Sequence, residues 1–190
     1  MKLQDRLPDS VTVDGKRYKL DLDFRNVLDL METLNRDDLI PEARAYKALK
    51  CVLRRVPRDY INILAEVRKL LFGHSGPSDG KKLTDFQQDA DLIRAAFRQV
   101  YNIDLYRDRL HWIEFTCLLA NLPEGSRYSE ILGIRARPMP KATKYNADER
   151  QWLAKAKATY ALKVSEEEAR SNYEKGVHDL FIALKGMAKR

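Results

Sequence analysis

Apolar residues recur at helical spacing along most of the chain, and the longest single stripe lies in residues 85–101. Its members are mostly three or four positions apart, which places them on one face of a helix. They are Phe86, Ala90, Ile93, Phe97, Val100 and Tyr101. Thr84 or Asp85 is placed to cap the start of this helix. A second stripe follows a candidate cap at Asp21 or Asp23 and contains Phe24, Val27, Leu28, Met31 and Leu34. Two amphipathic helices are therefore predicted.

Breakers and capping residues delimit the other predicted helices. Pro41 suits the first turn of a helix through Val52, and Gly73 ends another that Pro57 opens. Residues 110–122 are apolar nearly all the way round, which indicates a helix buried between others. Three more helices are predicted. The first ends at Gly133 or before Pro138, and the second is capped by Asn146. The third begins at a capping box formed by Ser165 and Glu168 and runs through Leu184. Residues 74–82, "HSGPSDGKK", are predicted to be a loop.

The first 20 residues show an alternating pattern instead. The stretch "VTVDGKRYKL" has a β-branched run and then Asp14-Gly15, a pair that tolerates the positive φ of a tight hairpin turn. The sequence therefore predicts a mainly α protein with a short N-terminal β-hairpin and a C-terminal helical extension. We place a helical core domain in residues 1–137 and a basic linker with C-terminal helices in residues 138–190. The boundary rests on "RARPMPKATKYN", in which prolines flank Met139 and disfavour helix.

Positive charge is concentrated towards the C-terminal end. The formal net charge is +7, and residues 135–163 hold eight basic residues against two acidic ones. This segment is a candidate contact surface. Its candidate contact residues are Arg135, Arg137, Lys141, Lys144, Arg150, Lys155 and Lys157. Tyr145, Trp152 and Tyr160 lie between these cations, a pattern typical of single-strand nucleic-acid binders. This basic segment has three interpretations: contact with a protein partner, nucleic-acid binding through residues 135–163, or a solvated basic arm.

The polar residues that could carry chemistry are better explained as structural. Asp85 and Asp89 are one helical turn apart, but both lie where the helix dipole favours negative charge. His111 and Glu114 form one reversed copy of the Glu-x-x-His spacing that helical di-metal sites use twice. We expect them to bond each other or a backbone group. Phosphate-binding and nucleophile-elbow motifs are absent. The sequence therefore predicts no enzymatic activity, no cofactor and no metal site.

Several large side chains are instead expected to form a core. Ile93, Phe97, Trp112 and Phe115 are predicted to be buried together. Cys51 and Cys117 each lie in an apolar helical pattern and are expected to be buried, reduced thiols.

Membrane and secretory signals are also absent from the sequence. No apolar run approaches the roughly 18 residues that a membrane span needs. The first ten residues, "MKLQDRLPDS", lack the apolar region of a secretory signal. We therefore expect a soluble cytoplasmic protein.

Two long segments carry a family resemblance. "DFQQDADLIRAAFRQVYNIDL" followed by "LHWIEFTCLLANLPEGSRYSEILGIRARPMPK" resembles small tail-assembly proteins of long, non-contractile-tailed phages, encoded close to the tape measure protein. The early stretch "LPDSVTVDGKRYKLDLDFRNVLDL" fits as well, so the resemblance covers residues 5–162.

The resemblance implies the role of a tail assembly chaperone. Such a protein coats or escorts the aggregation-prone tape measure protein and helps to recruit tail-tube subunits. The implied partners are the tape measure protein and the tail-tube protein, with self-association as a further candidate. The implied location is the host bacterial cytoplasm, with the protein missing from the finished virion. The resemblance brings no catalytic residues.

Overall fold

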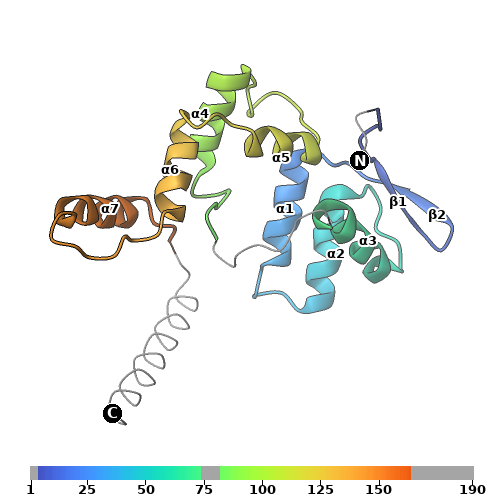
Figure 1. Cartoon of the computed structure of the whole chain (residues 1–190). Helices are drawn as coiled ribbons and strands as arrows, with labels where there is room; N and C mark the ends of the chain where they lie inside the picture. Colours follow the sequence, from blue (N-terminus) through green and yellow to red (C-terminus); the bar gives the residue numbers. More distant parts are fainter. Residues whose placement is uncertain (1–3, 74–81, 164–190) are drawn as a thin grey trace, which may run out of the picture. The chain divides into compact units, whose positions relative to one another are not determined.

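A computed structural model describes residues 4–73 and 82–163 of the chain (Figure 1). The described residues are 53% helical, which confirms the mainly α class. The elements are β1 Ser10–Val13, β2 Lys16–Lys19, α1 Phe24–Leu34, α2 Pro41–Val52, α3 Tyr60–Phe72, α4 Ala90–Tyr101, α5 Trp112–Ala120, α6 Arg127–Ala136 and α7 Ala147–Tyr160. Backbone contacts group the chain into two compact units. Unit 1 comprises Met1–Lys82 and Asp89–Glu130, and unit 2 comprises Leu83–Gln88 and Ile131–Arg190.

The predicted hairpin is confirmed at the start of unit 1. β1 and β2 pair antiparallel, with Val13 opposite Lys16, so the connecting turn is Asp14-Gly15. Both turn residues have positive φ, 48° and 73°, as a tight two-residue hairpin turn requires. β1 packs against α3, with Val11 and Val13 buried. Packing on a helix provides the stability that a two-stranded sheet lacks by itself.

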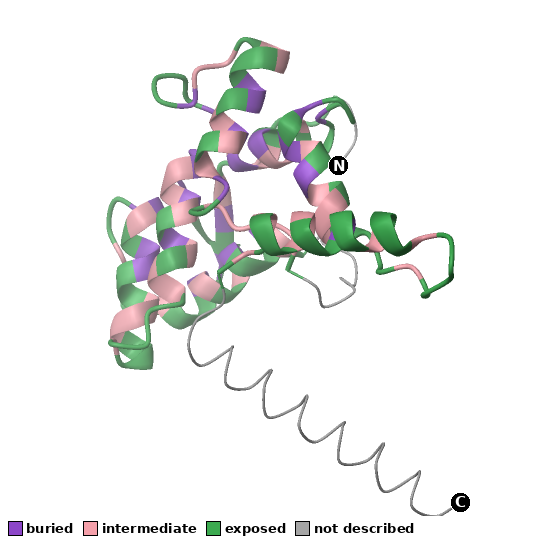
Figure 2. Ribbon diagram, turned by 90° about the vertical axis from the view of Figure 1, so that its left-hand side faces the viewer, coloured by how far each residue is buried: buried purple, intermediate pink, exposed green. Residues whose placement is uncertain are grey.

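Helices α1, α2 and α3 form the next part of unit 1, with α2 in contact with both of the others. Buried residues form stripes along the helices rather than covering them, as Figure 2 shows in purple. Fully buried members of these stripes are Val27 and Leu30 in α1, Ala48 and Leu49 in α2, and Ile63 and Val67 in α3. Asp23 caps α1, because its carboxylate accepts a hydrogen bond from the Arg25 amide. Pro41 opens α2 and Gly73 ends α3, as predicted.

An aromatic cluster joins α1, α4 and α5. Phe115 stacks on Phe24, Phe97 and Trp112, with ring centroids 4.6, 5.3 and 5.9 Å apart. Phe97 and Phe115 are at most 1% exposed, and Trp112 is nearly as well buried. Ile93 is buried too. The predicted core is therefore confirmed.

Two predicted helices differ from the observed ones. α4 begins at Ala90 rather than at Thr84 or Asp85. The Asp85 carboxylate accepts from the backbone amides of Gln87 and Gln88, so it closes a separate turn before the helix. α5 is shorter than the predicted residues 110–122, and only Trp112 and Phe115 within it are buried. The prediction of a helix buried all round was wrong, because α5 buries only the face that carries Trp112 and Phe115.

Unit 2 is held together by side-chain bonds to backbone groups. The Arg135 guanidinium, at the end of α6, donates to the carbonyls of Tyr160 at 2.7 Å and Leu83 at 2.9 Å. The Lys157 ammonium donates to the Arg135 carbonyl at 2.8 Å. Gln88 exchanges two hydrogen bonds with the Lys163 backbone. Residues 131–137 therefore group with α7, whereas the sequence-based division lay between residues 137 and 138.

Some predicted elements lie outside the described residues. They are the helix from Ser165 through Leu184 and most of the loop at residues 74–82. α6 runs past Gly133 to Ala136, which agrees with the predicted end before Pro138. Among the described residues, no helix combines the length and apolar character that a bilayer crossing demands.

Candidate functional site

The seven cations predicted to contact a partner divide into two groups in unit 2. Four of them bind other residues of the same unit: Arg135 and Lys157 as described above, Arg137 to the Glu149 carboxylate, and Arg150 to the Pro140 carbonyl. A guanidinium or ammonium held by a carbonyl or carboxylate offers fewer donors to a partner. These four residues therefore stabilise the packing of α7 and the linker before it.

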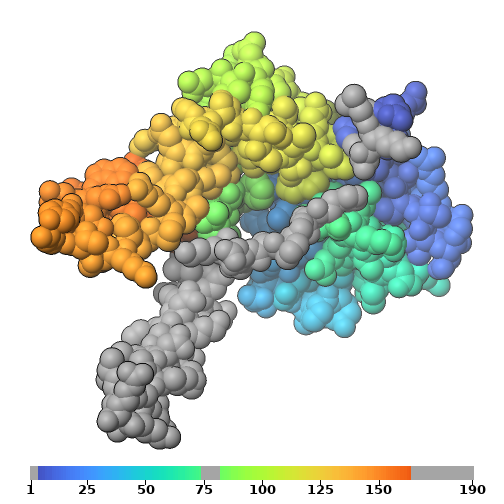
Figure 3. All heavy atoms as spheres, viewed as in Figure 1, coloured from blue at the N-terminus to red at the C-terminus, as the bar shows by residue number. Residues whose placement is uncertain are grey.

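The other three cations, Lys141, Lys144 and Lys155, are exposed. Three large apolar side chains near them in sequence are exposed as well, Met139 at 42%, Tyr145 at 84% and Trp152 at 55%. The Lys144 ammonium lies 4.7 Å from the centroid of the Tyr145 ring. We call these six residues the α7 surface. Figure 3 shows one face of the segment of residues 137–160, which includes it, in orange.

The sequence of α7 explains why Trp152 faces solvent. Successive residues of a helix point about 100° apart. Leu153 is completely buried, so its neighbour Trp152 is turned away from that contact. Lys155 is three positions after Trp152 and lies on the same side of the helix. An exposed indole beside a lysine is therefore a consequence of how Leu153 docks.

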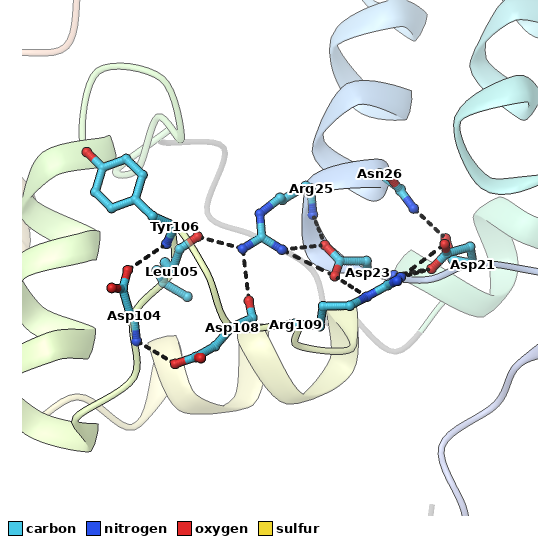
Figure 4. Close-up of polar contacts among 9 residues, drawn as sticks. All are labelled: Asp21, Asp23, Arg25, Asn26, Asp104, Leu105, Tyr106, Asp108 and Arg109. Atoms are coloured by element: carbon cyan, nitrogen blue, oxygen red, sulfur yellow. Dashed lines mark hydrogen bonds and ion pairs between the residues drawn. The ribbon is translucent and has the colours of Figure 1, made fainter.

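A second polar cluster lies in unit 1, around the first turn of α1 (Figure 4). Arg25 binds the Asp23 carboxylate at 3.1 Å and donates to the carbonyls of Leu105 and Asp108, both at 2.8 Å. Arg109 contacts Asp23 at 3.2 Å and Asp21 at 2.8 and 3.0 Å. Asp23 is the buried member of the cluster. Two arginines therefore neutralise two aspartates.

This cluster fastens the segment before α5 to the start of α1. The Phe24 amide donates to the Leu110 carbonyl at 2.9 Å, and the Trp112 amide donates to the Leu22 carbonyl at 2.8 Å. Hydrogen bonding to Asp21, and then its charge, raise the pKa of the Arg109 guanidinium above its ordinary value. Both carboxylates are engaged by arginine, which makes the arrangement structural rather than one of acid–base catalysis.

Two surface concavities also belong to unit 1. The smaller, of about 370 Å³, lies between α1 and α3 and has Met31, Leu34 and Phe72 among its lining residues. The larger, of about 550 Å³, lies where the end of β2 meets the end of α2. Lys19, Lys50 and Arg54 are the basic residues of its lining.

Comparison with known protein families gives a match that covers most of the chain. Residues 3–162 match the family model described as Bacteriophage Gp15 protein. The chain belongs to this family. No curated protein and no solved structure matches it. The family indicates a phage protein with a structural or assembly role.

In this Gp15 family member, both ring nitrogens of His111 contact backbone groups. Its Nδ1 accepts from the Ile113 amide at 3.1 Å and so caps α5, while Nε2 lies 2.9 Å from the Pro8 carbonyl. The prediction that His111 bonds a backbone group is confirmed. Glu114 is exposed in the first turn of α5. Within residues 4–73 and 82–163, no three His, Cys, Asp or Glu residues gather as metal ligands would.

The two thiols differ from the prediction that both are buried. Cys117 is exposed and Cys51 is only partly buried. Both lie in apolar stretches, but α5 turns Cys117 to solvent because that helix buries one face only. Burial raises the pKa of the Cys51 thiol, which favours its uncharged form.

The acidic residues around α4 occupy structural positions. Asp91 pairs with Arg94 at 3.1 Å, an i, i+3 ion pair on one face of α4. Asp89 is buried directly before the helix and Asp85 closes the preceding turn. The Arg25 and Arg109 cluster was not predicted, because each arginine reaches groups 80 or more positions away. No local sequence pattern signals such a contact.

Proposed function

We propose that this protein is a phage tail assembly chaperone. In this proposal it is a binding protein without enzymatic activity that escorts the tape measure protein and helps to recruit tail-tube subunits. It acts in the host bacterial cytoplasm and is missing from the finished virion. Membership of the Bacteriophage Gp15 protein family, over residues 3–162, is the observation that carries the proposal.

The α7 surface supports a role in protein binding. Tyrosine, tryptophan and methionine are enriched in protein interfaces, where a few aromatic anchors provide most of the binding energy. Tyr145 and Trp152 are such residues, and both are exposed in the chain alone. Lys141, Lys144 and Lys155, which are near them in sequence, add exposed positive charge that favours an acidic partner.

The smaller concavity of unit 1 offers a complementary feature for a helical client. An amphipathic helix docks by inserting apolar side chains into a groove. Met31, Leu34 and Phe72 give the concavity apolar walls, and its volume of about 370 Å³ suits one or two side chains of a client.

Nucleic-acid binding through residues 135–163 is the alternative function. Tyr145 and Trp152 could stack on bases, with lysines on the phosphates. However, four of the seven cations are held within unit 2, and the Tyr160 carbonyl accepts from Arg135 in a half-buried position. The positive charge available to a phosphate backbone is therefore smaller than the sequence suggested, which favours the protein partner.

Co-purification with the tape measure protein of the same phage tests the proposal. Tagged wild-type chain should retain the co-expressed tape measure protein and keep it soluble. The triple variant K141Q/K144Q/K155Q should retain about tenfold less at low salt, because exposed charges act over longer distances there. The matched control K16Q/K47Q/K69Q removes the same charge from unit 1 and should bind as wild type.

Two results would count against parts of this proposal. Failure of the wild-type chain to retain the tape measure protein would contradict the chaperone role. Equal retention by the two triple variants would leave the role intact but remove the α7 surface from it. Tight, salt-sensitive binding of a random oligonucleotide, lost in K141Q/K144Q/K155Q, would instead favour the nucleic-acid alternative.

A further inference from the structure

The larger concavity of unit 1 is built where two elements end side by side. The Asp21 amide, just beyond β2, donates to the Val52 carbonyl at the end of α2 at 2.9 Å. This bond joins the two chain segments that line the hollow of about 550 Å³. Leu20, Val52 and Leu53 are buried members of the lining. The hollow therefore has a fixed floor that belongs to the packed part of the unit.

The charges around this hollow are not balanced. Lys19, Lys50 and Arg54 contribute three exposed cations. Asp21 is the single acidic residue of the lining, and Arg109 already holds its carboxylate at 2.8 and 3.0 Å. Within the described part of the chain, no ion pair joins any of the three cations to a carboxylate. Arg55 and Arg58, on the loop after α2, add further exposed positive charge nearby in sequence.

Helix electrostatics account for only part of this arrangement. Lys50 lies in the last turn of α2, where the negative end of the helix dipole favours a cation. Lys19 comes from β2 and Arg54 from beyond the end of the helix, so the dipole does not explain their presence. Three cations from three positions in the sequence therefore converge on one hollow.

We infer that this concavity is a binding site for an acidic segment of a protein partner, separate from the α7 surface. Its volume lies in the range of pockets that hold small ligands or a few side chains. A guanidinium such as that of Arg54 matches a carboxylate with two parallel hydrogen bonds, and the lysines neutralise neighbouring acidic groups.

The lining favours a peptide over a nucleic acid. It contains no aromatic side chain on which a base could stack. Its apolar members, Leu20, Val52 and Leu53, suit the hydrocarbon parts of glutamate side chains. The inference does not depend on the identity of the client, because it rests on the charges and shape of this hollow.

Cys51 lines the hollow and provides a local reporter of occupancy. The probe is a peptide of twenty glutamates, added to the full-length C117S chain so that Cys51 is the only thiol. The rate of iodoacetamide modification of Cys51 should fall several-fold when the peptide is bound. Fluorescence anisotropy of a labelled copy of the peptide gives the affinity in parallel.

Charge variants separate this site from general attraction to a basic protein. K19Q/K50Q/R54Q should weaken peptide binding about tenfold, since each exposed ion pair contributes roughly a twofold to fivefold factor. K141Q/K144Q/K155Q removes equal charge from unit 2 and should change the affinity less than about threefold. Circular dichroism should be the same for all variants, because the substituted side chains are exposed.

The same assay can overturn the inference. Unchanged Cys51 modification at saturating peptide, or equal weakening by the two triple variants, would show that the hollow is not the site. Stronger protection of Cys51 by an oligothymidine than by the peptide would assign it to nucleic acid instead. None of these results bears on retention of the tape measure protein, so the inference and the proposed function can fail independently.

Discussion

Arg25 fixes the segment before α5 with a single side chain. Its guanidinium reaches two backbone carbonyls, those of Leu105 and Asp108, and the buried carboxylate of Asp23. A planar guanidinium can satisfy all three acceptors at once, whereas an ammonium is a point donor. Arg25 therefore connects α1 to the loop that leads into the aromatic core.

We expect Arg25→Ala to lower the free energy of unfolding by about 2–3 kcal/mol, because hydrogen bonds to a charged group are lost and carbonyls are left without a donor. Arg25→Lys should lower the free energy of unfolding by a smaller amount than Arg25→Ala. Arg107→Ala is the matched control, since that side chain is 87% exposed and its carboxylate partner lies 3.9 Å away. Its change should stay within about 0.5 kcal/mol. Urea denaturation of the three variants measures these changes in the free energy of unfolding. Equal decreases for Arg25→Ala and Arg107→Ala would contradict the role given to Arg25.

The two cysteines should differ in reactivity. Cys117 is exposed, whereas Cys51 is partly buried and its pKa is raised by that burial. A raised pKa leaves less thiolate at a given pH, and the thiolate is the reactive form. Iodoacetamide at pH 7.5 should therefore modify Cys117 several-fold faster, as mass spectrometry over time would show. In C117S the fast phase should disappear, and two equal rates in the wild-type chain would refute this assignment.

At the scale of elements, local signals predicted where most helices and the hairpin lie. Pro41, Gly73 and Asp23 act within a turn of their own position, so their roles follow from the sequence alone. The start of α4 and the burial of α5 were mispredicted, because both depend on contacts made elsewhere. The Asp85 carboxylate caps a separate turn before α4 instead of the helix itself. Packing on one face of α5 determines which of its apolar residues are buried.

The hairpin turn gives a test at this scale. Gly15 has φ of +73°, and a Cβ added there would meet no atom within 4 Å. Gly15→Ala should therefore lower the free energy of unfolding by roughly 1 kcal/mol through backbone strain alone. Gly125→Ala is the matched control, because its Cβ would also meet nothing and its φ is not positive. That variant should be neutral or slightly more stable. A neutral Gly15→Ala would show that the turn adopts another conformation.

At the scale of the whole molecule, the candidate site could be predicted only in outline. The basic segment is visible in the sequence, but which of its cations are available depends on backbone acceptors in unit 2. Arg135 was predicted to contact a partner, yet its donors reach Tyr160 and Leu83, which lie 25 and 52 positions away. The larger concavity was not predicted, because Lys19 and Arg54 lie far apart in the sequence and meet only through the fold.

The division into two units predicts how the chain responds to truncation. A chain ending at Pro140 loses α7, and with it the buried Leu153 and the Tyr160 carbonyl that accepts from Arg135. We expect the backbone amides of residues 131–136 to lose protection in hydrogen exchange, because their packing partners are gone. The aromatic core of unit 1 does not include α7, so amides of α1, α4 and α5 should keep their protection.

Two further chains make this test decisive. A chain ending at Lys163 keeps every described residue, so comparing it with the chain ending at Pro140 isolates the loss of residues 141–163. Full-length R135A keeps α7 but removes the two hydrogen bonds of the Arg135 guanidinium, so it should loosen residues 131–136 and α7 together, whereas K155A, at an exposed position, should not. Loss of protection in α1, α4 and α5 on truncation at Pro140 would show that the chain folds as one cooperative body. Full protection of residues 131–136 in that truncated chain would show that α7 is dispensable for unit 2, leaving the α7 surface as an appendage whose role is binding alone.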